Sequence, residues 1–108
     1  MLRPAADEIF SALADPTRRA IFERLCREGE QNVRRLTGPA GVSQPAVSKH
    51  LSVLHRAGLV RRRREGRQTH YSAQPAGLAP AIDWMRVYAA FWQGRFDRLE
   101  SLLQRMDQ

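Results

Sequence analysis

The order of hydrophobic and polar residues predicts a mostly α-helical chain with one β-hairpin. A first helix is expected over residues 5–14. A second is expected from Pro16 to about Glu28, because Asp15 is a favoured N-cap and proline is tolerated in the first helical turn. The apolar face of the first helix consists of Ile9, Phe10 and Leu13. That of the second consists of Ile21, Phe22 and Leu25.

A helix-turn-helix is predicted next. Residues 32–37 form its short first helix, and the segment Gly38-Pro39-Ala40-Gly41 is expected to break the chain. Ser43 can cap the following helix, which is expected over about residues 43–57. The inward face of that helix consists of Val47, Leu51 and Leu54. Its outward face consists of Gln44, Ser48, Lys49, Ser52 and Arg56, none of which is apolar.

A hairpin and a long helix complete the predicted elements. The hairpin covers about residues 59–73, with a connection around Glu65-Gly66-Arg67. The helix runs over about residues 78–106. Its apolar residues recur at steps of three and four: Trp84, Met85, Tyr88, Phe91, Trp92, Phe96, Leu99, Leu102, Leu103 and Met106. Such a stripe is longer than one small domain can cover, which favours an interface with a second copy of the chain.

Composition adds a strong positive charge at a defined place. The 108 residues include 43% hydrophobic ones, which is enough for one folded domain over residues 1–108. The net charge is +7, and residues 43–73 hold seven basic residues against Glu65 alone. A basic block of this kind is expected to meet a polyanion. The sequence has no apolar run of bilayer length and no signal-peptide pattern, so we expect a cytoplasmic protein without a membrane partner.

Double-stranded DNA is the polyanion that the pattern favours. The helix over residues 43–57, which we call the recognition helix, offers a DNA major groove a polar and basic face. Gln44 can read adenine, and Lys49 can reach guanine or phosphate. Ser43, Ser48 and Ser52 are short enough for a close backbone approach. The hairpin, which we call the wing, would follow the DNA backbone or the minor groove with its arginines, including Arg63, Arg64 and Arg67.

Three segments of the chain resemble the ArsR (arsenic-repressor) family of winged-helix repressors. They are ALADPTRRAIFERL, VSQPAVSKHLSVLHRAGLV and RRREGRQTHYS, and they cover roughly residues 8–73. The resemblance implies a homodimer that represses transcription and leaves DNA when an effector binds. It also implies a wing tip around Arg64 and Arg67. The residues it places on the DNA-reading surface are Ser43, Gln44, Pro45, Ala46, Ser48 and Lys49.

The fold expected is therefore a winged helix-turn-helix, mostly α, of the order α-α-α-α-β-β-α, whose terminal helices form the dimer interface. The interface residues expected are Ile9, Phe10, Leu13, Trp84, Tyr88, Phe91, Trp92 and Leu99. A two-fold dimer would set two recognition helices about one DNA turn apart, on a palindromic operator.

No catalytic, metal or cofactor site is expected. Metal-sensing members of the family carry cysteine pairs near the third helix, where this chain has Asn32-Val33-Arg34-Arg35-Leu36. The last helix has carboxylates but no histidine, which suits transition metals poorly. Cys26, the one cysteine, lies beside the apolar face of the second helix and is expected to be buried.

Two other functions stay open at this point. The chain could be a redox or small-ligand sensor that uses Cys26 or the aromatic last helix, with an effector that the sequence does not name. It could also be a winged helix that binds another protein and no DNA.

Overall fold

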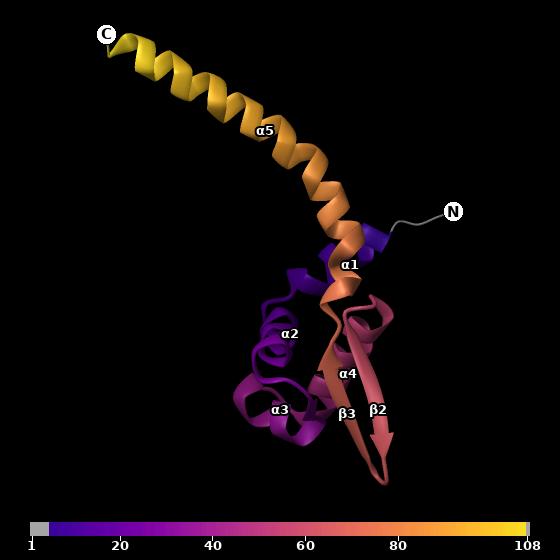
Figure 1. Ribbon diagram of the computed structural model, residues 1–108. Coiled ribbons are helices and arrows are strands. Elements are labelled where there is room, and N and C mark those ends of the chain that lie inside the picture. The colour runs from indigo at the N-terminus through magenta and orange to yellow at the C-terminus, as the bar shows by residue number, and fades with distance from the viewer. Residues whose placement is uncertain (1–4, 108) are drawn as a thin grey trace.

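The computed structural model describes residues 5–107. Residues 1–4 and 108 of the expected domain lie outside them. The elements, shown in Figure 1, are α1 (Ala5–Ala14), α2 (Pro16–Glu28), β1 (Gln31–Asn32), α3 (Val33–Ala40), α4 (Gln44–Arg56), β2 (Val60–Glu65), β3 (Gln68–Ala73), the 3-10 helix η1 (Pro75–Leu78) and α5 (Ala79–Met106). This order is the predicted winged helix-turn-helix with two short additions, β1 and η1.

Side-chain caps start two of the helices where the sequence predicts. The carboxylate of Asp15 accepts a hydrogen bond from the backbone nitrogen of Arg18 at 2.8 Å. The hydroxyl of Ser43 accepts one from the backbone nitrogen of Ala46 at 3.3 Å. Each cap satisfies a donor that a helix start leaves without a partner, and a proline follows within two residues. The predicted starts of α2 and α4 are confirmed.

The predicted break over residues 38–41 is wrong for most of that segment. Helix α3 continues to Ala40, and Gly41, with a φ of 72°, ends it. Pro39 lies inside the helix and cannot donate the usual bond to the carbonyl of Arg35. That carbonyl accepts a hydrogen bond from Nη1 of Arg24 on α2 instead, at 3.0 Å. The last turn of α3 persists because a side chain from another helix replaces the missing donor.

The wing belongs to a three-stranded antiparallel sheet of order β1-β3-β2. Strand β1 pairs Gln31 with Tyr71 and Asn32 with His70. Strands β2 and β3 are joined by a two-residue turn in which Gly66 has a φ of 61°. A glycine with positive φ at the first turn position is typical of tight hairpins. The sheet ties the wing to the start of α3.

The core lies between α1 to α4 and the base of the sheet. It confirms the predicted inward faces of α2 and α4. Its members are Ile9, Ala12, Ile21, Phe22, Leu25, Leu36, Val47, Leu51, Leu54, Leu59, Val60, Tyr71 and Ala81.

Helix α5 leaves this domain and extends far beyond it (Figure 1). Its first turns pack on α1, where the Phe10 ring meets the Trp84 ring edge-on at 5.4 Å. In the described chain the one residue of α5 that is buried is Ala81. The extension gives the molecule dimensions of 69 × 35 × 19 Å.

A close backbone approach fixes where α5 starts. A Cβ added at Gly77, in η1, would clash with the carbonyl oxygen of Gly58, in the turn between α4 and β2. We expect Gly77→Ala to destabilise the fold by about 1–3 kcal/mol, because backbone rather than a flexible side chain must move. Chemical denaturation would measure it. Gly94→Ala is the control, because a Cβ on Gly94 meets nothing within 4 Å, and alanine there should stabilise α5 by about 0.5–1 kcal/mol. Equal effects would contradict the close approach.

Candidate nucleic-acid interface

Helix α4 presents a polar face to solvent. Its inward residues Val47, Leu51 and Leu54 are fully buried, and this packing fixes which face points outward. Ala46 is half-buried at the first turn. The remaining predicted contact residues of the helix start and of its outward face are exposed: Ser43, Gln44, Pro45, Ser48, Lys49, Ser52 and Arg56. The structure thus leaves these predicted recognition residues accessible, with Arg56 at the far end of α4, where it lines a cavity with Asp7, Glu8 and Ser11 of α1.

The arginines of the wing divide between the two faces of the hairpin. Arg62 pairs across the strands with Tyr71, and Arg63 pairs with His70. Residues paired across antiparallel strands share a face, so Arg62 and Arg64 lie on one face and Arg63 on the other. No ion pair engages Arg62, Arg64 or Arg67 in the described part of the chain. These three guanidinium groups keep their charge available for a phosphate.

Arg63 differs from its neighbours because two carboxylates hold it. Its guanidinium lies 2.8 Å from Oε1 of Glu30 and 3.0 Å from Oε2 of Glu65. The hydrogen bond from Arg63 holds the pKa of Glu30 below its usual value, and the two carboxylates raise the pKa of Arg63. Predicted as a DNA contact, Arg63 is placed by the structure in an ion-pair cluster that ties the wing to the loop after α2.

A groove beside the wing contains residues that sequence reasoning missed. It has a volume of about 300 Å³ and is lined by Asn32, Val33, Arg34, Gln44, Arg67, Gln68 and Thr69. The Nδ2 of Asn32 contacts Oε1 of Gln68 at 3.4 Å. Gln44 and Arg67 were predicted, but Asn32, Arg34, Gln68 and Thr69 were not. The pairing of β1 with β3 brings them together, and a two-residue strand leaves no signal in the sequence.

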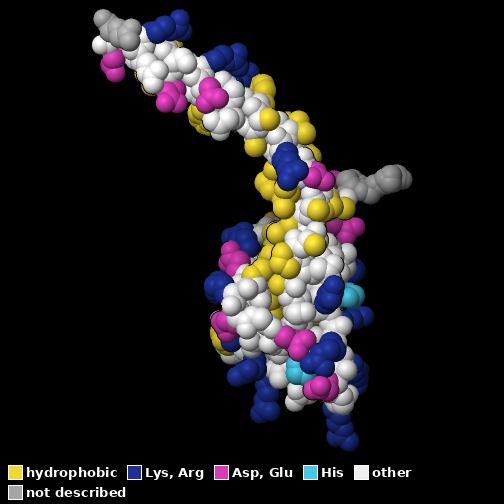
Figure 2. All heavy atoms as spheres, viewed as in Figure 1, with side chains coloured by type: hydrophobic (Ala, Val, Ile, Leu, Met, Phe, Trp, Pro, Cys, Tyr) yellow, Lys and Arg dark blue, Asp and Glu magenta, His cyan; other side chains and the backbone are white. Residues whose placement is uncertain are grey.

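The predicted interface residues of the terminal helices divide between core and surface. Ile9 is buried at 1% exposure and Leu13 is half-buried, so most of the apolar face of α1 packs in the core of its own domain. Phe10 remains 38% exposed. On α5 the residues Trp84, Tyr88, Phe91, Trp92 and Leu99 are about half exposed. Figure 2 shows hydrophobic side chains along α5 and basic side chains gathered at the opposite end of the molecule, around the wing tip.

Cys26 is exposed, and the prediction that it is buried is wrong. The buried residues of α2 are Ile21, Phe22 and Leu25, and among the described residues Cys26 lies outside this buried arc. Partial desolvation still raises the pKa of the Cys26 thiol, which disfavours the reactive thiolate. Among residues 5–107, no three His, Cys, Asp or Glu side chains are grouped so as to hold a metal ion. Over the same residues, no helix is long and apolar enough to cross a bilayer.

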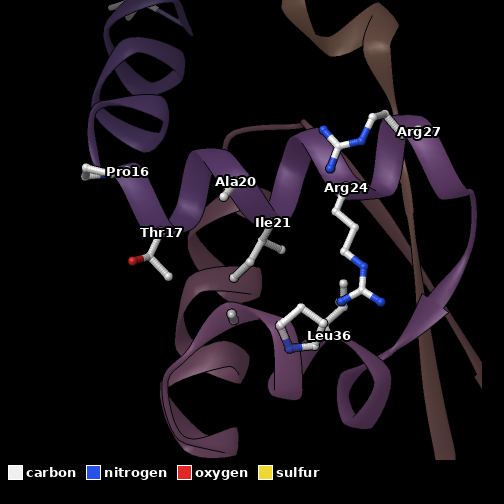
Figure 3. Close-up of a pocket in the computed structure, with 9 residues that line it drawn as sticks. Pro16, Thr17, Ala20, Ile21, Arg24, Arg27 and Leu36 are labelled. Carbon is white, nitrogen blue, oxygen red and sulfur yellow. The ribbon is translucent and has the colours of Figure 1, made fainter.

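A second cavity, of about 330 Å³, lies between α2 and α3 (Figure 3). Its lining is mostly apolar and includes Ile21, Leu36 and Pro39. Arg24 extends across it, bonded to Glu28 and to the carbonyl of Arg35. None of the predicted DNA-contacting residues lines this cavity.

Comparisons with known proteins agree with this architecture. The profile described as "Bacterial regulatory protein, arsR family" matches residues 15–62. The HTH-type transcriptional regulator Rv2034 of Mycobacterium tuberculosis is 49% identical over 68% of this chain and 67% of its own length. The transcriptional repressor SdpR of Bacillus subtilis is 32% identical over 73% of this chain and 87% of its own. A solution structure from Mycobacterium bovis, a homodimeric winged helix-turn-helix DNA-binding domain, superposes with a TM-score of 0.63 at 28% identity, covering 80% of this chain and 79% of that one.

Proposed function

Because this chain belongs to the ArsR family of bacterial regulatory proteins, we propose that it binds an operator as a homodimer and represses transcription by occupying the promoter. The observation that carries the proposal is the exposed polar face of α4 beside a wing in which Arg62, Arg64 and Arg67 make no ion pair in the described part of the chain. A polar helix face suits base edges in the major groove, and unpaired arginines suit phosphates. The proposed DNA-binding surface and the proposed dimer interface lie at opposite ends of the molecule, because the apolar α5 extends away from the wing (Figure 2).

A salt series on two duplexes tests the proposal. One duplex is selected from a random pool by the protein itself, and the other is an unselected duplex of equal length. We expect a palindromic selected site, bound roughly 10³- to 10⁷-fold more tightly than the unselected duplex, with steep salt dependence on both. No binding at low salt would favour a protein-binding winged helix instead. Equal affinity for the two duplexes would contradict a sequence-specific regulator.

Gln44 is proposed to read a base. It is exposed at the first turn of α4 and also lines the groove next to the wing. We expect Gln44→Ala to relax specificity at one base pair of each half-site, at a cost of about 1–3 kcal/mol per contact. Affinities for the selected duplex and its single-base variants would measure this. A loss of equal size on selected and unselected DNA would contradict a base-reading role.

Arg34 is proposed to meet a backbone phosphate from the groove beside the wing. It is exposed on α3 and lines that groove with Arg67. Arg34→Ala should weaken binding to all sequences and reduce the salt slope by about 1 per protomer. Arg35→Ala removes the same charge from the next position, which is exposed and does not line the groove. Equal slopes in the two variants would place the phosphate elsewhere.

A further inference from the structure

The guanidinium of Arg18 joins three parts of the chain. Its Nε donates to the carbonyl of Ala12 at 2.6 Å, and its Nη2 donates to the carbonyl of Ser11 at 3.2 Å. Both carbonyls are in the last turn of α1, where a helix leaves acceptors without partners. Its Nη1 lies 3.4 Å from Nδ1 of His50, on the recognition helix α4. A side chain from α2 therefore touches α1 and α4 at once.

The chemistry of these groups sets the direction of each contact. A guanidinium can only donate hydrogen bonds, so this contact is a hydrogen bond when Nδ1 of His50 accepts and the ring proton lies on Nε2. Arg18 is half-buried, and so is His50. Partial burial strengthens a charge-assisted contact relative to one in open solvent. The contact specifies one tautomer of His50 and one placement of its helix against Arg18.

The connection between α1 and α2 is short enough to transmit this placement. Asp15 is the single residue between the two helices, and it also caps α2 through the backbone nitrogen of Arg18. Helix α1 packs on α5 through Phe10 and Trp84, at the apolar side of the molecule. Arg18 is thus placed between the proposed dimer side and the recognition helix.

We propose that Arg18, through His50, is a positioning residue that sets the orientation of the recognition helix relative to the dimerisation helices. The inference rests on the proposed function as a dimeric DNA-binding protein. Two recognition helices must lie about one DNA turn, roughly 34–36 Å, apart to meet both half-sites. A small rotation of α4 against α1 changes that separation, so the contact selects the half-site spacing that the dimer accepts.

Arg19 supplies a matched control. Its Nη1 donates to the carbonyl of Leu13 at 2.9 Å, at the same end of α1. No hydrogen bond of Arg19 reaches α4 in the described part of the chain. Arg18→Gln and Arg19→Gln therefore remove equal charge, and each removes bonds to the end of α1, two for Arg18 and one for Arg19. Of the two arginines, Arg18 is the one that also contacts His50. His50→Ala is the complementary variant, because it leaves the bonds of Arg18 to α1 in place.

The experiment measures the affinity of each dimer for the selected operator and for versions with one base pair added to or removed from its centre. For Arg18→Gln and His50→Ala we expect the preference for the native spacing to fall by roughly 2- to 30-fold. The double variant, Arg18→Gln with His50→Ala, should lose no more of the spacing preference than either single variant. Arg19→Gln should keep the preference. Affinity for unselected DNA should fall equally in Arg18→Gln and Arg19→Gln, which remove the same charge, and stay unchanged in His50→Ala. Unchanged spacing preference in both Arg18→Gln and His50→Ala would overturn the proposal.

A measurement without DNA separates this inference from the proposed function. In nitrogen NMR of the dimer, the Nδ1 resonance of His50 should shift in Arg18→Gln and stay in place in Arg19→Gln. If the Nδ1 resonance of His50 is the same in Arg18→Gln as in the wild type, the inference is overturned, even if the wild-type dimer binds its operator. A wild-type dimer that binds no duplex would overturn the proposed function and, with it, the role of Arg18 in half-site spacing.

Discussion

Replacing Leu99 with glutamate is expected to convert the dimer to monomers and to weaken binding to the two-half-site operator by roughly 100-fold or more. Leu99 is 51% exposed and belongs to the C-terminal half of α5. Figure 1 shows that the C-terminal end of α5 extends far beyond the domain. A carboxylate buried against a second apolar helix would lose its hydration without gaining a partner. Each monomer would then bind one half-site without help from the other. Analytical ultracentrifugation and operator titration would measure the two effects.

Ser101→Glu is the control for that experiment. Ser101 is exposed two residues further along the same helix, about 200° around its axis from Leu99. It adds the same charge outside the apolar stripe, so dimerisation and operator affinity should change little. Both variants should keep the folded domain, because neither residue belongs to the core. A Leu99→Glu protein that remains dimeric at micromolar concentration would contradict the assignment of α5 to the interface.

The reason α5 is assigned to a second copy is the distribution of exposed apolar residues. In the described chain, every large exposed hydrophobic residue except Phe10 lies on α5. They include aromatic pairs whose rings are in contact along the helix, such as Trp84 with Tyr88, tilted at 41° with 4.6 Å between ring centroids. Arg95 lies over the Phe91 ring at 4.2 Å and adds a cation to this surface. Monomers rarely expose contiguous apolar surface of such length, whereas dimer interfaces are built from it.

The sequence predicted those parts of the fold that local chemistry decides. Asp15 and Ser43 cap their helices through their own side chains, so the starts of α2 and α4 needed no knowledge of the rest of the chain. The inward face of α4 followed from helical spacing alone. The end of α3 could not be predicted in this way. Its last turn, which contains Pro39, depends on the hydrogen bond that Arg24, a residue of another helix, donates to the carbonyl of Arg35. A contact between residues so far apart leaves no local pattern.

The candidate DNA surface divides in the same way. Helical periodicity was sufficient to place Gln44 and Lys49 outward. The sequence could not distinguish the four arginines of β2, because that distinction depends on Glu30, which lies in a loop 33 positions before Arg63. The exposure of Cys26 was missed for a related reason: a residue at the edge of an apolar stripe is buried only if another element covers it. Tertiary contacts decide these cases.

The wing is expected to supply much of the binding energy through charge. Arg64→Ala with Arg67→Ala removes two arginines that no ion pair engages in the described chain, and a dimer carries four such positions. If each meets one phosphate, the slope of log affinity against log salt should fall by about 4. The affinity should drop on the order of 1,000-fold at about 0.1 M salt, on selected and unselected DNA alike. Fluorescence anisotropy across a salt series would measure both quantities.

The loss of positive charge alone would lower DNA affinity to some extent. The double variant therefore needs a control variant that loses the same charge elsewhere. Arg27→Ala with Arg86→Ala removes two exposed arginines from α2 and α5, outside the wing and the recognition helix. The long-range attraction to DNA falls by a similar amount in the two double variants, and phosphate contacts change only in the wing variant. The wing variant should therefore have the smaller slope by about 4 per dimer. Equal slopes would mean that the arginines of the wing attract DNA at a distance without contacting its backbone.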